Sequence, residues 1–331
     1  MKLHFLLSLA TALICFFSSV AQSSGYQLAK TYKILSPGGW DYIAVWEGKI
    51  YASHGTQVNI LDEQTGDSVG VIPNTTGVHG IAFIPSMGKG YTSNGRINTI
   101  TVFNTKTNEV LKQIPAGQNP DAILYEPFSK KIITCNGRSR DLSLVDPATE
   151  TVVATIPVGG KPETAVSDGE GKLYVNLEDK NSVAVIDLKT SKVESNWPLP
   201  AEGPTGLAID KKTKRLFAGC DGFLVVMNAT NGKIVEKLPI GDGCDGVAFD
   251  NSLKYIFASC GEGKLSIVQE YSGDQFKVID NVPTKRSART LAIDEHTHEV
   301  FLPAADLQPA KNGERPQMAP GSFQVLVMEK K

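Results

Sequence analysis

Residues 162–203 read PETAVSDGEGKLYVNLEDKNSVAVIDLKTSKVESNWPLPAEG. Four short segments in this stretch, PETAVSD, LYVN, SVAVID and VESNWPL, have the length and the β-branched or aromatic content of strands, and turn-forming residues separate them. Residues 120–160 repeat the same order as PDAILYE, IITCN, DLSLVD and TVVATIPVGG. Two adjacent copies of a four-strand unit predict a repeat protein.

Two landmarks fix the period of the repeat. A proline in or just after the last strand recurs in steps of 42, 42, 41 and 41 residues, at Pro73, Pro115, Pro157, Pro198 and Pro239. An Asp or Asn at the exit of the third strand recurs in the same steps, at Asp62, Asn104, Asp146, Asp187 and Asn228. These side chains start turns by accepting hydrogen bonds from the backbone two residues on. The pairs that follow tolerate positive φ, namely Thr65-Gly66, Thr107-Asn108, Asn231-Gly232 and Ser272-Gly273.

The chain holds seven such repeats. Their first strands start at Asp41, His79, Asp121, Glu163, Thr205, Asp245 and Arg289. The last repeat stops after its third strand, Phe323–Val327, whereas residues 26–35 resemble a fourth strand that has no first three. Pairing the two pieces closes a ring and leaves no open sheet edge. Residues 22–331 are therefore predicted to form a single all-β domain, a seven-bladed β-propeller with four-stranded antiparallel blades.

The strand sequences also resemble a known repeat family. Leu173–Asn176, Ser182–Asp187 and Thr151–Gly160 are similar to the YVTN (YncE-like) β-propeller repeat, in which a YVTN strand and a V-x-V-I-D strand precede V-x-x-I-P-V-G. The resemblance covers essentially the whole mature chain, although residues 177–180 replace a Gly-rich linker and Gln269-Glu270 replaces an Asp. It implies a secreted or periplasmic propeller. Related propellers are binding platforms, subunits of cofactor enzymes or lactonases.

The first residues have the pattern of a secretory signal peptide. Residues 1–21 combine a basic Lys2, an apolar stretch and the small residues Ser19-Val20-Ala21 before the cleavage point. A membrane anchor would need a longer span, and Ile14 before Cys15 argues against lipidation. Without this segment the chain has 32 basic and 35 acidic residues, a net charge that argues against nucleic acid or an anionic membrane as partner. We expect a secreted or periplasmic monomer with no membrane span in the mature chain.

Two sets of positions at one end of the blades are candidates for a site. The residues that begin the first strands are strongly polar, unlike the alanines that follow them, and they include Asp41, His79, Asp121, Glu163, Asp245 and Arg289. The residues that end the second strands include His54, Asn94 and Asn136. Because both sets belong to the same face of a propeller, we expect them to surround the channel mouth. A pocket for a small molecule, a peptide or an envelope protein is one interpretation, and a water-filled channel is the other.

The sequence leaves the chemistry at the mouth open. Binding without catalysis is the first hypothesis, because there is no Gly-x-Ser-x-Gly, nucleotide loop, paired-cysteine zinc signature or CxxCH haem site. The alternative is a lactonase-like metal-dependent hydrolase or lyase that uses the carboxylates and His79 as general base. No cofactor is predicted, but His54 and His79 with Asp41 or Asp121 leave room for a divalent metal. A third hypothesis is a purely structural role in an envelope complex.

A long loop and four cysteines are the remaining irregular features. Residues 303–322 replace a short loop of the other blades, and they either fold over the mouth as a lid, adding Lys311 and Arg315 beside Arg289, or cover the closing blade. Three pairings of the mature cysteines are conceivable. A Cys220–Cys244 or Cys244–Cys260 disulfide and unpaired buried thiols all stay open, since Cys135 has no evident partner.

Overall fold

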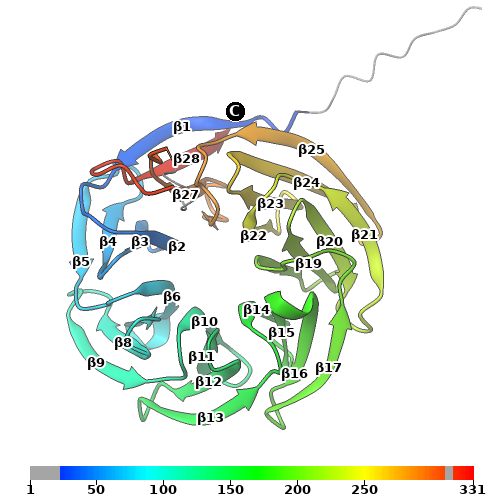
Figure 1. Ribbon diagram of the computed structural model, residues 1–331, viewed down its shortest axis with the longest axis horizontal. Helices are drawn as coiled ribbons and strands as arrows, with labels where there is room; N and C mark the ends of the chain where they lie inside the picture. The colour runs from blue at the N-terminus through cyan, green and yellow to red at the C-terminus, as the bar shows by residue number, and fades with distance from the viewer. Residues whose placement is uncertain (1–22, 310–315) are drawn as a thin grey trace, which may run out of the picture.

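The protein is a ring of sheets around a central channel. The computed structural model describes residues 23–309 and 316–331, and within them the chain forms seven four-stranded antiparallel sheets (Figure 1). The predicted seven-bladed β-propeller is thereby confirmed. The predicted leader lies outside the described residues. In the part of the chain that the structure describes, no helix has the length and apolar character needed to cross a membrane.

Each of the first six blades uses four consecutive strands, with the first strand at the channel and the fourth at the rim (Figure 1). Blades one to three consist of β2 (Trp40–Trp46), β3 (Lys49–His54), β4 (Gln57–Asp62) and β5 (Ser68–Ile72); β6 (Val78–Ile84), β7 (Lys89–Asn94), β8 (Thr99–Asn104) and β9 (Val110–Pro115); and β10 (Pro120–Glu126), β11 (Lys131–Asn136), β12 (Asp141–Asp146) and β13 (Thr151–Pro157).

Blades four to six follow the same plan. They consist of β14 (Pro162–Ser167), β15 (Lys172–Leu177), β16 (Ser182–Asp187) and β17 (Lys192–Pro198); β18 (Leu207–Asp210), β19 (Arg215–Cys220), β20 (Phe223–Asn228) and β21 (Ile234–Pro239); and β22 (Cys244–Asp250), β23 (Tyr255–Cys260), β24 (Lys264–Ser272) and β25 (Gln275–Pro283). Two short 3-10 helices interrupt the connections, η1 (Pro85–Met87) in blade two and η2 (Glu178–Lys180) in blade four.

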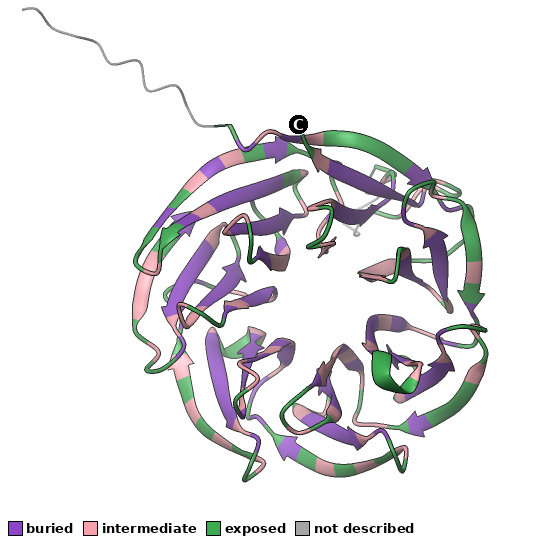
Figure 2. Cartoon of the chain, turned by 180° about the vertical axis from the view of Figure 1, so that it is seen from behind, coloured by how far each residue is buried: buried purple, intermediate pink, exposed green. Residues whose placement is uncertain are grey.

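Burial follows the position of a strand within its blade. The second and third strands are buried along nearly their whole length, as in β7 and β8, because the neighbouring blades cover both faces of each sheet. The rim strands alternate between exposed and partly buried residues, as β17 does (Figure 2). The core is therefore divided into layers between blades, and side chains such as Ile100 and Val102 fill one of these layers.

The turns after the third strands form as the sequence predicts. The Asp62 carboxylate accepts hydrogen bonds from the backbone N–H groups of Gln64 and Thr65, and Asn104 and Asp146 accept the same pair in their copies. Asp187 accepts from the Thr190 N–H, and Asn228 accepts from the Thr230 N–H. Gly66 has a φ of +75°, and a Cβ there would lie 2.1 Å from the Tyr32 ring. A residue with a side chain would thus be both strained and too close. The Ser272-Gly273 turn differs, since neither residue has positive φ.

Blade seven joins the two ends of the chain. It consists of β26 (Ala292–Ile293), β27 (Val300–Ala304), β28 (Gln324–Lys330) and, as its rim strand, β1 (Tyr26–Lys33), so the N-terminal strand lies beside the C-terminal one (Figure 1). The predicted closure is confirmed. The rim strand ends at Lys33 rather than at residue 35, since its pairing with β28 stops at Lys33 opposite Gln324, and Leu35 beyond it is 79% exposed.

The four cysteines of the described chain are buried free thiols. Cys244 and Cys260 are direct partners across β22 and β23, whereas Cys135 and Cys220 lie in other blades. The structure therefore favours unpaired thiols among the arrangements that the sequence leaves open.

Candidate functional site at the channel mouth

All seven residues expected to begin the first strands meet at one cavity. The cavity has a volume of about 540 Å³ and is lined by Asp41, Tyr42, His79, Asp121, Lys161, Glu163, Glu178, Thr205, Asp245 and Arg289. Thr205 and Arg289 precede β18 and β26, and the other five ring residues lie second in their strands. The repeat alignment thus predicts correctly which side chains come together here.

Backbone irregularities turn the ring residues toward the channel. In five blades the register between the first and second strands shifts around the ring residue, so that Asp41, His79, Asp121, Glu163 and Asp245 each lie within a bulge. A β-bulge takes its residue out of the ladder and re-aims the side chain. Hydroxyl groups satisfy the backbone that the bulges free: the Gly80 N–H donates to Ser93 Oγ at 2.8 Å, and Ser53 Oγ donates to the Tyr42 carbonyl at 2.9 Å.

A continuous chain of charged contacts crosses four blades. Arg289 Nε donates to Asp245 Oδ2 at 2.6 Å, and its Nη2 donates to Asp41 Oδ1 at 3.1 Å. The other oxygen of Asp41, Oδ2, lies 2.5 Å from His79 Nδ1. Burial opposes protonation of His79, but the hydrogen bond to Asp41 and the nearby charge of Asp121 outweigh it and raise the pKa of the imidazole.

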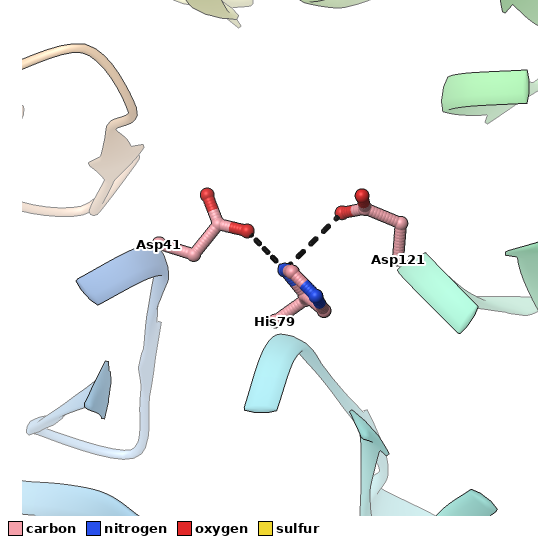
Figure 3. Close-up of side chains that lie close together, drawn as sticks. All are labelled: Asp41, His79 and Asp121. Atoms are coloured by element: carbon pink, nitrogen blue, oxygen red, sulfur yellow. Dashed lines mark hydrogen bonds and ion pairs between the residues drawn. The ribbon is translucent and has the colours of Figure 1, made fainter. Parts of the chain in front are cut away.

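Asp121 lies next to this chain of contacts but forms no hydrogen bond with it. Its Oδ1 lies 3.7 Å from His79 Nδ1, on the opposite side from Asp41 (Figure 3). Within the described residues, no hydrogen bond reaches the Asp121 carboxylate, and only 14% of its side chain is exposed. Burial, reinforced by the charges of Asp41 and Asp245, raises the pKa of Asp121 to about 7, although His79 opposes the rise.

A second cluster of charged side chains at the mouth belongs to blade four. Lys161 Nζ contacts Glu163 Oε1 at 2.6 Å and also contacts Glu178, which lies in η2. Burial and the charge of Asp121 nevertheless raise the pKa of Glu163 to about 8. Glu178 belongs to the 177–180 segment that departs from the repeat pattern, and this departure could have identified it as a site residue. No feature of the sequence identified Tyr42 and Lys161 as residues that line the cavity.

The cavity has an excess of negative charge. Among the described residues, five carboxylates line it, against two permanent cations, Lys161 and Arg289. With His79 neutral and every carboxyl ionised, the excess is three charges. Burial is the main cause of the raised pKa values of Asp121, Glu163 and Asp245, and the neighbouring carboxylates reinforce it against the opposing effect of the nearby cationic groups.

A second, apolar cavity lies next to the mouth along the channel. Its volume is about 190 Å³, and it shares Tyr42 and Asp245 with the mouth. Aliphatic side chains make up most of its wall, among them Ile81, Ile123 and Leu291. Together the two cavities offer a charged region with an apolar compartment adjoining it at Tyr42 and Asp245.

The second set of predicted site residues does not line the cavity, and this expectation was wrong. His54, Asn94 and Asn136 are fully buried inside their blades. His54 lies between Ser36 Oγ and the Gly38 carbonyl and stacks on a phenylalanine ring. Asn94 and Asn136 donate to side chains of the third strands. Because the second strands are not bulged at these positions, their side chains stay between the blades and satisfy polar groups there.

The blade-seven loop contributes no lining residue among those described. Its two arms pair through Leu307 and Met318, and Met318 packs on the core beneath blades one and seven. Asp306 forms an ion pair with Lys285 at 2.5 Å. Lys311 and Arg315, which were expected to add positive charge at the mouth, lie outside the described residues. The described arms of the loop pack against the closing blade, which is the second of the two interpretations.

Asp41, His79 and Asp121 are the described residues whose donor atoms converge most like a metal site. One oxygen of each aspartate and one imidazole nitrogen lie within 4.8 Å of one another, and all three side chains point to a common position above His79 (Figure 3). They come from β2, β6 and β10, the first strands of three successive blades.

Comparison with known proteins supports the fold alone. The solved structure of hydrazine synthase from Kuenenia stuttgartiensis is similar, with a TM-score of 0.71 and 16% sequence identity over 80% of this chain and 92% of that chain. No family model and no curated protein matches the sequence. At this identity the likeness shows that the chain shares a β-propeller fold with that structure.

Proposed function

We propose that this protein is a secreted or periplasmic binding protein of the YVTN (YncE-like) β-propeller family that takes a positively charged organic ligand at its channel mouth. The observation that carries the proposal is the set of five carboxylates that, among the described residues, faces two permanent cations around one cavity of about 540 Å³. A cation there would replace the protons that Asp121 and Glu163 take up near neutral pH.

The neighbouring apolar cavity narrows the class of ligand. A protonated amine would stand beside Asp245, which lines both cavities, and an apolar substituent of that amine would extend past Tyr42 into the apolar cavity. Pockets of this kind combine apolar walls with a few placed polar groups that fix orientation. Both a free amine and a lysine side chain of a peptide or envelope protein have this chemistry. The comparison with known proteins does not favour the hydrolase hypothesis, and we do not propose it.

The test compares three probes that differ in charge at one end. Isothermal titration at pH 8.5 and low salt would measure binding of 2-phenylethylamine, 2-phenylethanol and 3-phenylpropanoate to the mature protein. We expect the amine to bind, the alcohol to bind about 10-fold more weakly and the carboxylate not to bind, because the cavity potential favours positive charge. Raising the salt concentration is expected to weaken amine binding through screening.

Matched variants locate the binding. Asp245→Asn removes one charge from the mouth, whereas Glu109→Gln removes one charge from an exposed turn before β9. We expect Asp245→Asn to weaken amine binding about 10-fold, an electrostatic loss of about 1.4 kcal/mol, and Glu109→Gln to leave it unchanged. Equal affinity for amine and carboxylate probes, or equal effects of the two substitutions, would contradict the proposal.

A further inference from the structure

We propose that Asp41, His79 and Asp121 form a binding site for one divalent transition-metal ion, of which Zn²⁺ is the test case. The inference rests on the proposed function in one respect, since both need the negative charge of the channel mouth. It goes beyond that function by assigning three ligand atoms to an inorganic cation. The ion would lie between His79 Nδ1 and one oxygen of each aspartate (Figure 3).

The distances suit a shared ion after small side-chain movements. His79 Nδ1 lies 2.5 Å from Asp41 Oδ2 and 3.7 Å from Asp121 Oδ1. Ligand atoms that surround one Zn²⁺ at about 2.0–2.2 Å are about 3–4 Å apart from one another. The ion would take the place of the proton that His79 and Asp41 now share, and that proton would leave to solvent. Asp121, whose carboxylate has no hydrogen bond among the described residues, would gain a partner.

The surroundings already fix two of the three ligands. Arg289 donates to Asp41 Oδ1 at 3.1 Å, which leaves Oδ2 directed at His79. The imidazole packs on Gly95, where a Cβ would lie 2.6 Å from His79 Nε2, so the ring has its Nδ1 side toward the channel. Outer partners that orient carboxylate and imidazole ligands are a regular part of metal sites. Glycine at position 95 is thus explained by the position of the ring.

The donor set indicates which ions fit. One imidazole nitrogen and two carboxylate oxygens suit Zn²⁺, Mn²⁺, Fe²⁺ or Co²⁺, whereas Ca²⁺ needs about six to eight oxygen ligands. Three protein ligands leave at least one coordination position, and it would face the cavity of about 540 Å³, where water or a ligand group has room. The expected order of affinity is Zn²⁺ above Mn²⁺, and both above Ca²⁺.

The competing explanation is an ordinary ion-pair network, in which His79 and Asp41 share a proton and cations merely gather in a negative cavity. The two explanations differ in how specific the ligands are. At pH 8.5, where both carboxyls are mostly ionised, Asp121→Asn and Glu163→Gln each remove negative charge from the same cavity, but only Asp121 belongs to the three ligands. Coordination predicts unequal effects of these substitutions, and simple electrostatic attraction predicts equal ones.

The experiment measures Zn²⁺ binding to the mature protein after treatment with a chelator. Competition with a chromophoric chelator gives the dissociation constant, and elemental analysis after gel filtration gives the stoichiometry. We expect one Zn²⁺ per chain in the wild type, a loss of about 100-fold or more in affinity for Asp121→Asn and His79→Gln, and a loss of about 3-fold for Glu163→Gln. Absence of a one-to-one site, or equal losses for Asp121→Asn and Glu163→Gln, would overturn the proposal.

Measurements on the wild type cover the case in which a variant does not fold. Zn²⁺ is expected to raise the melting temperature and Ca²⁺ to leave it unchanged, because only an ion that binds the folded state stabilises it. Co²⁺ is expected to give visible absorption bands that Zn²⁺ displaces. If metal-free protein binds 2-phenylethylamine, but Zn²⁺ neither raises the melting temperature nor displaces bound Co²⁺, the metal site alone is wrong. If neither the amine nor Zn²⁺ binds, the proposed function fails as well.

Discussion

Glu163 is the carboxyl at the mouth with the clearest consequence for stability. Asp121, Lys161 and Glu178 face it, and burial together with the charge of Asp121 raises its pKa to about 8 despite the contact with Lys161. A carboxyl whose pKa is raised on folding adds stability that is complete below its unfolded pKa, about 4.5, and that is lost as the pH rises through 8. The ligand-free protein is therefore expected to be less stable at alkaline pH, where Glu163 is ionised.

The substitution Glu163→Gln tests this at the residue scale. It removes the carboxyl and keeps the side-chain volume, so we expect the melting temperature at pH 8.5 to rise by about 5 °C, with little change at pH 5. Scanning calorimetry of both proteins at the two pH values measures the difference, and Glu109→Gln serves as the control for loss of a surface charge. A melting temperature that falls at pH 8.5 would show that the contact with Lys161 dominates instead.

Single residues also show which parts of this site could be predicted from the sequence. The seven ring residues were predictable, because the repeat places them at one position and their chemistry differs between copies. His54, Asn94 and Asn136 looked equivalent to them in sequence, but their side chains point between the blades. In three of the bulged blades a serine hydroxyl such as that of Ser93 bonds the freed backbone, and the sequence does not show that these contacts re-aim the ring residues.

At the scale of elements, β1 holds the ring closed. Residues Tyr26 and Tyr32 are buried within it, and the Tyr26 hydroxyl donates to the His298 carbonyl at 2.8 Å. Removing β1 would leave the edge of β28 unpaired and expose the apolar layer beneath it. The strand was predictable, since it supplies the one part of the last repeat that the C-terminus lacks.

A mature chain that begins at residue 34 tests the closure. We expect it to melt more than 10 °C below a chain that begins at residue 22 and to aggregate, because two buried tyrosines contribute about 1.5–3 kcal/mol each before any strand pairing is counted. Calorimetry and gel filtration measure both effects. Unchanged melting and monomeric elution would mean that six blades and three strands are sufficient.

The thiols belong to the same scale, because strand pairing determines which of them meet. Cys244 lies opposite Cys260, and the hydrogen bond between their thiols, together with burial, holds the pKa of Cys244 well above its usual range. Burial likewise raises the pKa of Cys220 to about 12. The hydrogen bond with Cys244 instead lowers the pKa of Cys260. All four thiols are nevertheless buried, and buried thiols react slowly with thiol reagents.

We therefore expect none of the four described cysteines to react with a thiol reagent in the native protein, and all four to react in guanidinium chloride without reductant. Mass spectrometry after alkylation counts them. Two unreactive cysteines in the unfolded protein would reveal a disulfide, and Cys244–Cys260 would be the pair to examine. The sequence alone could not decide this, because it did not show that the two residues face each other.

At the scale of the whole molecule, the ring creates a site that no blade has alone. Each blade contributes one or a few polar side chains, and the channel gathers them into a cavity where seven strands converge (Figure 1). The sequence predicted this architecture because its period is regular. The ring residues already contain more carboxylates than cations, but the contributions of Lys161 and Glu178 to the charge of the cavity were not predicted.

The most direct test of the cation-binding site is a crystal structure of the mature protein grown with 2-phenylethylamine at pH 8.5. We predict that the ammonium group lies within hydrogen-bonding distance, about 3 Å, of Asp245 or Asp121, and that the phenyl ring occupies the apolar cavity beside Tyr42. An amine bound only at the rim of the blades, or a channel mouth without amine at saturating concentration, would contradict the account.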